Sequence, residues 1–300
     1  MDKKDFLTII SEDRILEREP MKNYTTFSVG GPAKFLITVN NGKELADVLS
    51  LIKKNEEKYF LLGNGSNILV SDKGYDGVVI KLGGDFQQIE TNEDRIKVGA
   101  GVTLSMLAKT AMQNSLTGLE FASGIPGTVG GALFMNAGAY GGEMKQVVTE
   151  VTAVDKEGNT VILDNAAMEF GYRTSSLKKN GLIALGCTVK LENGDKDTII
   201  NTMHDLSLKR KEKQPLEYPS AGSTFKRPEG YFAGKLIEDS GLGGFCVGGA
   251  QVSEKHKGFV INRDNASAKD VKKLIDEVIQ TVKDKQGVTL EPEVIFLGDF

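Results

Sequence analysis

The sequence contains no tryptophan, only two cysteines and only two histidines among its 300 residues. Cys187 and Cys246 lie far apart, no Cys-x-x-Cys pair is present, and only His204 and His256 could add metal ligands. These scarcities argue against a disulfide framework and against a structural zinc site. So little cysteine fits a reducing compartment, and we predict a cytoplasmic protein.

The sequence also lacks long apolar runs and an excess of charge of one sign. No apolar stretch approaches the roughly 20 residues that cross a bilayer, and charges interrupt the first 20 residues every few positions, so we expect no membrane insertion. The 37 basic and 41 acidic residues give a formal charge of −4, unlike the basic footprint of nucleic-acid-binding proteins. The expected partner is a small molecule or a specific protein, and no nucleic acid.

Glycine, in contrast, is abundant. It supplies 35 of the 300 residues, about 12% where roughly 7% is usual. The glycines cluster without a collagen-like period. Because glycine has no Cβ, backbone of this composition can approach a ligand closely, and the clusters are candidate binding loops.

Apolar periodicity predicts both helices and strands along the chain. Helices are expected over 43–58 and over 197–213. Another is expected from Thr103, with Leu104, Leu107, Ala108 and Ala111 on one face. The last is expected to begin at a capping box of Ser267 and Asp270, to bury a stripe from Val271 to Val282, and to end at Gly287. Strands are expected over 59–62, 77–80, 96–98, two within 147–163, and 182–191. The elements do not alternate regularly, which favours an α+β protein of at least two domains with a boundary near 195–215.

The first glycine loop is Gly63-Asn64-Gly65-Ser66-Asn67, directly after the strand 59–62. Its backbone N–H groups could converge on a phosphate, with Ser66 and Asn67 adding side-chain donors. A tight turn between strands is the alternative for this loop taken alone. It is not a Rossmann fingerprint, because Ile68 stands where a third glycine is needed, and Gly234-Lys235 is no Walker loop.

The second glycine loop, residues 124–143, is denser, and eight glycines fall within 118–142. We expect neither a strand nor an ordinary helix there. Such backbone suits a flat ring system or a pyrophosphate, with Asn136 and Tyr140 at the edges; a glycine-rich connection without a ligand is the alternative. A third glycine-containing segment lies at 26–31. Three such loops suit an extended dinucleotide.

Six segments together resemble one family. They are TTFSVGGPA (25–33), LLGNGSNILVSD (61–72), GIPGTVGGALFMNAGAYGGE (124–143), GYRTSS (171–176), PSAGSTFKRP (219–228) and LEPEV (290–294). In this order they resemble the signatures of the UDP-N-acetylenolpyruvoylglucosamine reductase family, the flavoproteins of peptidoglycan precursor synthesis. The resemblance spans residues 23–295.

The resemblance implies a vanillyl-alcohol-oxidase-like (PCMH-type) FAD-binding region over 1–200, with subdomains of about 1–70 and 71–200. A smaller α+β substrate-binding domain over 201–300 follows. The implied activity is NADPH-dependent reduction of UDP-N-acetylglucosamine enolpyruvate, with NADPH and a UDP-sugar as small-molecule partners and no obligate protein partner. No histidine lies in either glycine loop, so FAD is expected to be held non-covalently.

The resemblance also assigns cofactor-binding residues, all in the two glycine loops. They are Gly63, Asn64, Gly65, Ser66, Asn67, Gly124, Ile125, Pro126, Gly127, Val129, Gly130, Gly131, Asn136, Gly138, Tyr140 and Gly141. The pyrophosphate is expected on the first loop and the isoalloxazine near the second.

Three residues match the family's catalytic positions. Hydride addition to an enolpyruvyl group places negative charge beside a carboxylate, and Arg173 is the expected cation there. Ser223 is the expected proton donor, and Glu293 is expected to hydrogen-bond the developing enolate. Taken alone, Arg173 would fit a surface ion pair and Ser223 a turn. Ser223 lies in no Gly-x-Ser-x-Gly elbow, so it is not a hydrolase nucleophile.

The expected substrate-binding residues are Tyr172, Arg210, Lys213, Arg227, Gln251 and His256. Arg227 stands where many relatives have asparagine, and His256 could equally be a satisfied core or surface group. The short stretch from Gly243 to Lys257 leaves no room for the tyrosine-bearing lid of the family's long form, so the chain resembles the short, lid-less class. A flavin oxidase using oxygen and a non-catalytic flavin- or nucleotide-binding module are the rival functions.

Overall fold

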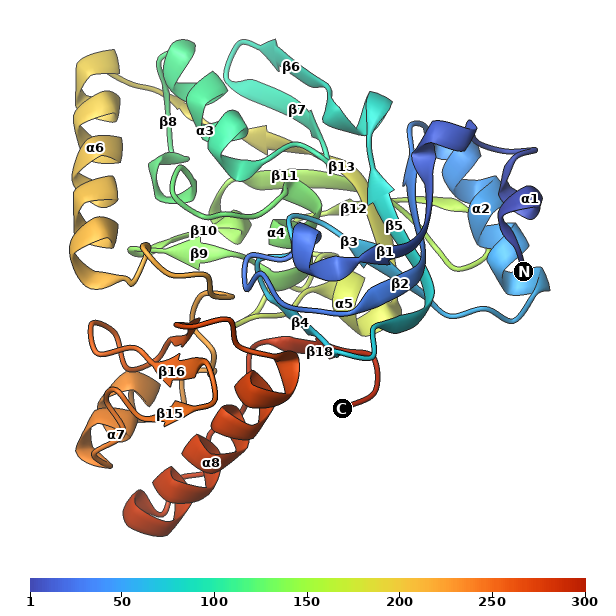
Figure 1. Ribbon diagram of the computed structural model, residues 1–300. Helices are drawn as coiled ribbons and strands as arrows, with labels where there is room; N and C mark the ends of the chain where they lie inside the picture. The colour runs from blue at the N-terminus through green and yellow to red at the C-terminus, as the bar shows by residue number, and fades with distance from the viewer. The chain divides into compact units, whose positions relative to one another are not determined.

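A computed structural model describes residues 1–300, and the chain divides into two compact units. The first unit comprises Met1–Glu17, Phe35–Asn64 and Val78–Arg210, and the second comprises Arg18–Lys34, Gly65–Gly77 and Lys211–Phe300. Neither unit is continuous in sequence. The expected division at residue 200 lies near the break at Arg210, but two early segments group with the C-terminal part (Figure 1).

A four-stranded sheet has the order β1 (Ile15–Pro20), β2 (Pro32–Val39), β5 (Tyr75–Leu82), β3 (Tyr59–Leu62). β3 and β5 are parallel, since Tyr59 pairs with Val78 and Leu62 with Lys81. Helix α2 (Gly42–Lys54) shares a core with this sheet through its buried stripe, which is Leu45, Val48, Leu49 and Ile52. Asn41 caps α2 by accepting the Glu44 N–H. The predicted helix-then-strand order is confirmed.

The first unit holds a five-stranded antiparallel sheet. Its order is β12 (Thr160–Asp164), β11 (Val148–Val154), β13 (Ile183–Lys190), β7 (Arg95–Gly99), β6 (Ile89–Asn92). The sheet shares a core with α3 (Leu104–Gln113), whose buried face is the predicted one: Leu104, Leu107, Ala108 and Ala111. The strands expected within 147–163 and over 182–191 are thereby confirmed.

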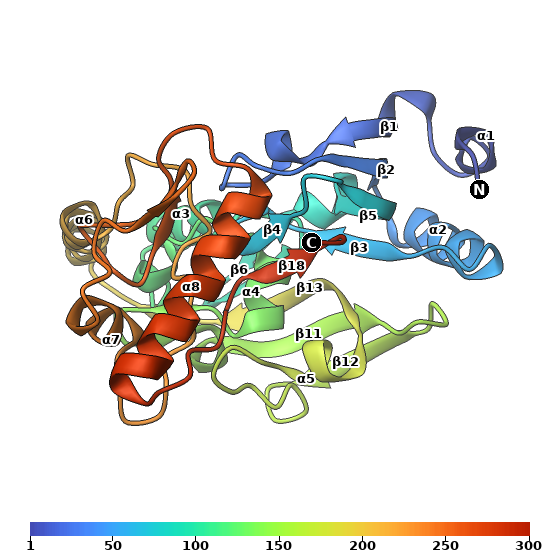
Figure 2. The same ribbon diagram turned by 60° about the horizontal axis from the view of Figure 1, so that its bottom comes forward.

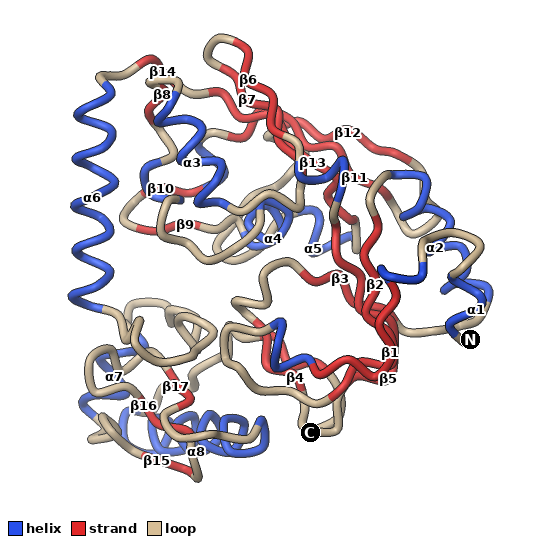
Figure 3. Tube along the Cα trace, turned by 45° about the horizontal axis from the view of Figure 1, so that its top comes forward, coloured by secondary structure: helices blue, strands red, loops and turns tan.

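The expectation that the second glycine loop contains neither a strand nor a helix is wrong. It holds the two-residue strands β9 (Gly138–Ala139) and β10 (Gly142–Glu143) as well as a helix. Residues Val129–Met135 form α4, drawn in Figure 3 as a short helix, although Gly130 and Gly131 lie in its first turn. Thr128 caps the helix by accepting the Gly131 N–H, and Val129, Ala132 and Leu133 are buried. Capping and burial of one face outweigh the roughly 0.5–1 kcal/mol that each glycine costs in a helix relative to alanine.

The remaining elements of the first unit are short apart from one helix. They are α1 (Lys3–Phe6), β8 (Leu116–Thr117), β9 (Gly138–Ala139), β10 (Gly142–Glu143), α5 (Ser176–Asn180), β14 (Glu192–Asn193) and the 3₁₀ turns Glu12–Arg14, Gly84–Gln87, Glu120–Ala122 and Met144–Gln146. The exception is α6 (Lys196–Lys213), of which only Ile199 is buried and whose last three residues belong to the second unit.

The second unit is organised around α8 (Ala268–Gln286), the long helix in Figure 2. Ser267 and Asp270 form the predicted capping box, and Gly287 ends the helix with a left-handed backbone. Its buried side packs with α7 (Ala233–Asp239) and with a sheet of β15 (Cys246–Val247), β16 (Ala250–Val252) and β17 (Val260–Asn262).

The N-terminal segments of the second unit are held to its C-terminal part by hydrogen bonds. β4 (Ile68–Val70) pairs in parallel with β18 (Ile295–Leu297). The other early segment of this unit contains the 3₁₀ turn Met21–Tyr24, which precedes the third glycine segment. The Asp72 carboxylate accepts the N–H groups of Ala268 and Lys269 at 2.8 and 2.9 Å. This bonding explains why distant parts of the sequence form one unit.

No helix is long and apolar enough to span a bilayer. Both cysteine thiols are free; Cys246 is exposed, and Cys187 is buried in β13. Burial raises the pKa of the Cys187 thiol to about 12, so this thiol is unreactive near neutral pH.

Candidate functional site

The division between the two units falls inside the first glycine loop, between Asn64 and Gly65. On the side of the first unit, the Asn64 Nδ2 donates to the Pro126 carbonyl oxygen at 2.9 Å. A Cβ on Gly63 would lie 2.6 Å from the Thr128 Oγ1. The first and second glycine loops are therefore joined by a side-chain hydrogen bond and by an approach that requires glycine.

On the side of the second unit, the loop contacts the third glycine segment. The Thr26 N–H donates to the Gly65 carbonyl at 3.1 Å, and Gly65 has φ +63°. A Cβ on Gly65 would overlap the carbonyl oxygen of Tyr24, so the fold itself requires glycine here. The Asn67 Nδ2 donates to the Glu293 carbonyl oxygen at 3.3 Å, which places the backbone of a predicted catalytic residue beside this loop.

The two glycine loops leave backbone groups and space free. The N–H groups of Asn64, Gly65 and Ser66 donate no hydrogen bond to other atoms of the chain. A Cβ on Gly131 would find only the Thr128 Oγ1 within 4 Å, at 3.6 Å, and one on Gly127 would find nothing nearer than 3.9 Å. Free N–H donors in a glycine-rich loop are a feature of phosphate-binding sites.

Tyr140 and Gly141 form the tip of the β9–β10 hairpin. Both have positive φ, +53° and +89°, and this two-residue turn joins strands in which Ala139 pairs with Gly142. The Tyr140 ring is exposed. A Cβ on Gly138 would lie 2.6 Å from the Gly142 carbonyl oxygen, and a Cβ on Gly142 would lie 2.5 Å from the Phe121 ring. The packing of the hairpin itself therefore requires glycine at both positions.

Arg210 lies beside the second glycine loop. A Cβ on Gly124 would come within 2.7 Å of the Arg210 Cδ. Burial lowers the pKa of the Arg210 guanidinium, while the charge of the nearby Tyr140 acts in the opposite direction. A half-buried cation therefore borders the loop, at a residue predicted to bind substrate. Lys213, one turn further along α6, is exposed and belongs to the second unit.

Arg173 occupies a tight turn with left-handed backbone, φ +56°. The turn is closed by hydrogen bonds between Gly171 and Thr174, at 3.1 and 3.4 Å. The Arg173 guanidinium lies 5.4 Å from the centroid of the Tyr172 ring, itself more than half exposed. A positive φ is uncommon for a residue other than glycine and marks positions that the surroundings hold in place.

Ser223 and Glu293 lie on neighbouring extended segments of the second unit. The Glu293 N–H donates to the Thr224 carbonyl at 2.8 Å, and Phe225 and Pro292 form an antiparallel bridge. The Ser223 Oγ makes only a long bond, 3.4 Å, to the Phe225 carbonyl. The structure thus brings two of the three predicted catalytic residues onto adjacent segments of one unit, while Arg173 belongs to the other unit.

His256 and Ser223 both lie close to Gly258, and His256 is held in a turn. Its Nδ1 accepts the Gly258 N–H at 3.1 Å, and its ring packs edge-on against Phe259. A Cβ on Gly258 would lie 3.0 Å from the His256 Cε1 and 3.7 Å from the Ser223 Oγ. Burial lowers the pKa of His256, so its imidazole is neutral at pH 7 with Nδ1 as the acceptor.

Gln251 and Arg227 are the other predicted substrate residues of the second unit. The Gln251 Nε2 donates to the Gly244 carbonyl at 3.2 Å from strand β16. The Arg227 guanidinium lies 4.1 Å from the centroid of the Phe232 ring. Both Arg227 and Phe232 are exposed. Their contact joins residues five apart in a loop, and no sequence pattern predicts such a contact.

Sequence reasoning passed over three residues that hold these loops together. Thr128 caps α4 and touches Gly63; a threonine before an apolar run is a helix-start signal that could have identified it. Thr26 donates its hydroxyl to the Ser220 carbonyl at 2.6 Å. Glu143 accepts from Asn136. The last two contacts join segments whose approach only the fold reveals.

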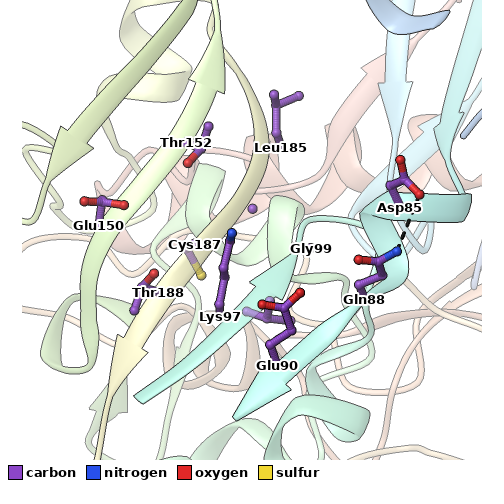
Figure 4. A pocket seen from close by; sticks show the side chains of 12 residues that line it. Asp85, Gln88, Glu90, Lys97, Gly99, Glu150, Thr152, Leu185, Cys187 and Thr188 are labelled. Atoms are coloured by element: carbon purple, nitrogen blue, oxygen red, sulfur yellow. Dashed lines mark hydrogen bonds between the residues drawn. The ribbon is translucent and has the colours of Figure 1, made fainter. Parts of the chain in front are cut away.

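One hollow lies away from all of these residues, on the five-stranded sheet (Figure 4). It measures about 290 Å³, and its lining includes the facing pair Gly99 and Gly186. Side chains of alternating strand positions, among them Glu90, Lys97 and Thr188, surround it. No predicted site residue lines this hollow, so it contributes nothing to the candidate site.

Comparison with protein families gives two matches that follow one another along the chain. Residues 33–164 match an FAD binding domain, and residues 214–297 match the C-terminal domain of UDP-N-acetylenolpyruvoylglucosamine reductase. The FAD binding domain match contains both glycine loops. The second match covers Ser223 and Glu293.

Curated relatives match over almost their whole length. The UDP-N-acetylenolpyruvoylglucosamine reductase of Clostridioides difficile strain 630 is 52% identical over 98% of this chain and 97% of its own. That of Caldanaerobacter subterraneus subsp. tengcongensis is 49% identical over 97% of this chain and 96% of its own. The match extends through both units.

Solved structures support the fold. The UDP-N-acetylenolpyruvylglucosamine reductase of Thermus caldophilus superposes with a TM-score of 0.82 and 38% identity, over 95% of this chain and 99% of its own. A variant of Phl p 4, described as a glucose oxidase, covers 64% of this chain and 44% of its own with a TM-score of 0.50 and 16% identity. The predicted vanillyl-alcohol-oxidase-like fold, with an FAD-binding domain and a second α+β domain, is confirmed.

The fold, the joined glycine loops and the near full-length identity agree with one another. An FAD-binding domain precedes the family's C-terminal domain in one chain. This protein is an FAD-dependent oxidoreductase and belongs to the UDP-N-acetylenolpyruvoylglucosamine reductase family.

Proposed function

We propose how this chain's own residues carry out the family's reaction, the reduction of UDP-N-acetylglucosamine enolpyruvate to UDP-N-acetylmuramate with NADPH. The observation that carries the proposal is that every motif of the expected site is present within a match of 52% identity over 98% of the chain. The expected order is ping-pong: NADPH reduces the enzyme and leaves before the enol ether enters.

The residues present fit FAD, because the first glycine loop leaves N–H donors free and the second leaves its backbone uncovered. The loops 63–67 and 124–131 would hold it, without a covalent bond, through their N–H groups. When bound, FAD supplies the hydride transfer from NADPH to the terminal carbon of the enolpyruvyl group. Asn64 keeps the loops together through Pro126.

The cofactor role of the second loop is tested at Gly131. Gly131→Ala is expected to weaken FAD binding at least about tenfold, since its Cβ would enter space that no protein atom fills. The same change is expected to stabilise the FAD-free protein by about 0.5–1 kcal/mol, because alanine favours the helix. Titration of FAD-free protein with FAD, followed by fluorescence, and thermal melts without FAD measure the two effects.

Gly42→Ala is the matched control for Gly131→Ala. Gly42 begins α2 in the same unit, and a Cβ there meets nothing within 4 Å. This variant is expected to bind FAD normally. Unchanged affinity in Gly131→Ala would contradict the cofactor role of α4. Gly65 variants cannot serve as this test, because any Cβ there overlaps Tyr24 whether or not FAD is bound.

Arg173 is proposed to stabilise the negative charge that develops at the substrate carboxylate and its neighbouring carbon. Its guanidinium stays charged at any working pH and can hold a carboxylate with two parallel hydrogen bonds. A charge held in place before the reaction needs no reorganisation when the enolate develops. The left-handed turn holds this residue's backbone in such a fixed position.

Ser223 is proposed to donate the proton that completes the reduction, and Glu293 to hydrogen-bond the developing enolate. The Ser223 hydroxyl is available to donate to substrate, since its hydrogen bond to the Phe225 carbonyl is long. A hydroxyl is a weak acid, but a carbanion-like centre is a strong base, so the transfer runs downhill when the geometry is right. The neutral imidazole of His256 and this hydroxyl both lie close to Gly258.

The substrate carries a diphosphate and a carboxylate, and cations are proposed to bind both. Arg210 and Lys213 lie one helical turn apart on α6, and Arg227 is oriented by the Phe232 ring. Tyr172, Gln251 and His256 are proposed as further substrate contacts. Arg227 is proposed to act at the diphosphate in place of the asparagine of many relatives.

The protein is proposed to work in the cytoplasm, as one of the lid-less class, with NADPH and the UDP-sugar as its small-molecule partners. We propose neither nucleic acid nor an obligate protein partner for it. Anaerobic titration tests the first half of this function: NADPH is expected to bleach the flavin absorbance stoichiometrically. A protein that binds FAD and is not bleached by NADPH would instead support a flavin-binding module.

A further inference from the structure

We propose that Asn136 is a positioning residue that fixes the Arg173 turn relative to the cofactor loop. The inference rests on the proposed role of Arg173. Asn136 was expected at the edge of the cofactor, yet its side chain is 3% exposed and engaged inside the first unit. All atoms involved belong to that unit.

The Asn136 amide uses both its donor and its acceptor capacity within the protein. Its Nδ2 donates to the Gly171 carbonyl at 3.2 Å and to the Glu143 Oε2 at 3.1 Å. Its Oδ1 accepts the Lys145 N–H at 2.9 Å. One buried side chain thereby joins three segments: the end of α4, the strand β10 region and the turn that carries Arg173.

The backbone of this position also selects asparagine. Asn136 ends α4 with a left-handed backbone, φ 45° and ψ 56°, which glycine and asparagine tolerate best. Glycine would keep the backbone but lose all three hydrogen bonds. Aspartate would keep the acceptor but lose the donors and place a second carboxylate beside Glu143. Only asparagine satisfies both the backbone and the bonding pattern.

The bond to Gly171 acts on Arg173 through a short turn. The Gly171 carbonyl also accepts the Thr174 N–H, and this bond, which helps to close the turn, is long at 3.4 Å. The hydrogen bond from the Asn136 side-chain amide to the same carbonyl therefore adds support to the turn. A further anchor comes from the same helix end, where the Ser175 Oγ donates to the Phe134 carbonyl at 3.0 Å. Arg173, with φ +56°, needs such external support to keep its conformation.

Helix α4 therefore contributes both to the proposed cofactor loop and to the anchoring of the Arg173 turn, within seven residues. Its first turn contains Gly130 and Gly131 of the second glycine loop, and its last residues anchor the Arg173 turn. A rigid element of this kind sets the placement of the proposed cation relative to the proposed cofactor site. Misplacement of about 1 Å in such an arrangement costs on the order of 10²-fold in rate.

The first measurement is amide hydrogen exchange of FAD-free and FAD-loaded protein. Asn136→Gly is expected to speed exchange in a peptide covering residues 171–176 at least about tenfold, with the strands of the five-stranded sheet unchanged. Asn114→Gly is the control, because Asn114 ends α3 in the same unit and its side chain bonds only the Thr110 carbonyl. Unchanged exchange at 171–176 would overturn the inference.

The second measurement is a double-mutant cycle on reoxidation of NADPH-reduced enzyme by substrate. Asn136→Gly is expected to slow reoxidation about 10- to 100-fold alone and to add no further loss in the Arg173→Ala background. Asn136→Asp, which keeps the acceptor, serves if Asn136→Gly folds poorly. Additive losses in the double mutant would overturn the positioning role of Asn136. A normal reoxidation rate in Arg173→Ala would overturn the proposed role of Arg173 instead. In that case the hydrogen-exchange measurement alone decides whether Asn136 anchors the turn.

Discussion

Ser223→Ala is expected to leave reduction of the enzyme by NADPH unchanged and to slow its reoxidation by substrate at least about 10²-fold, within the 10²–10⁴-fold range of a positioned acid. Reduction by NADPH needs no proton from this hydroxyl, whereas completing the enol ether reduction needs one at the carbon that received charge. Rapid mixing under anaerobic conditions, with flavin absorbance as the signal, measures each half-reaction separately.

The structure makes Ser223→Ala a clean test. The hydroxyl makes only the 3.4 Å bond to Phe225, so its removal leaves no short hydrogen bond of the fold broken. Ser220→Ala is the matched control, since this serine lies in the same motif and its hydroxyl makes no hydrogen bond within the chain. Slow reduction with normal reoxidation would instead place Ser223 in nicotinamide binding.

Arg173→Ala is expected to lower the rate of substrate reduction about 10²- to 10³-fold, the range found when one preorganised group facing a developing anion is removed. FAD content and reduction by NADPH are expected to stay near normal, because the turn lies outside the glycine loops. Arg173→Lys is expected to recover only part of the loss, since an ammonium lacks the planar fork that holds a carboxylate.

Arg18→Ala is the control for Arg173→Ala. Arg18 is also an arginine with left-handed backbone, φ 51°, on an exposed strand position. Backbone strain alone would give both variants similar effects, whereas the proposed charge role affects only Arg173. Equal rates for Arg173→Ala and the unmodified enzyme, at saturating substrate, would refute the role of Arg173 in catalysis.

The long helices could be predicted from sequence because their signals are local. The stripe from Val271 to Val282 is buried as expected, and Ser267 and Gly287 mark the ends of α8. Helix α4 was missed for the opposite reason: its two glycines argue against a helix locally, and its stability comes from a cap and from burial that depends on the surrounding fold.

The candidate site could be predicted only in part. Sequence identified both glycine loops, but not that Asn64 bonds Pro126 or that Gly63 lies against Thr128. These contacts join residues about 60 positions apart, and nothing local encodes them. The same limit applies to Asn136, because the hydrogen bonds of its side chain to Gly171, Glu143 and Lys145 could not be predicted from the sequence.

The division into units could not be foreseen from composition. Segment 65–77 joins the C-terminal unit through the pairing of β4 with β18 and the bonding of Asp72 to the start of α8. Segment 18–34 joins it through hydrogen bonds from Thr26 to the Ser220 carbonyl and from Asn262 to the Phe27 carbonyl. A strand of three residues carries too little pattern to predict its partner more than 200 residues away. The family resemblance predicts an FAD-binding region followed by a substrate-binding domain. Only the structure shows which segments of the chain make up each unit.

The most direct test of the proposed reaction is one anaerobic turnover. The purified FAD-loaded enzyme is reduced with NADPH, separated from nucleotide, and mixed with UDP-N-acetylglucosamine enolpyruvate without oxygen, with absorbance and mass spectrometry as readouts. The proposed mechanism predicts that the oxidised flavin spectrum returns and that one UDP-N-acetylmuramate forms per flavin. A spectrum that returns only when air is admitted, with no such product, would contradict the mechanism and favour an oxidase.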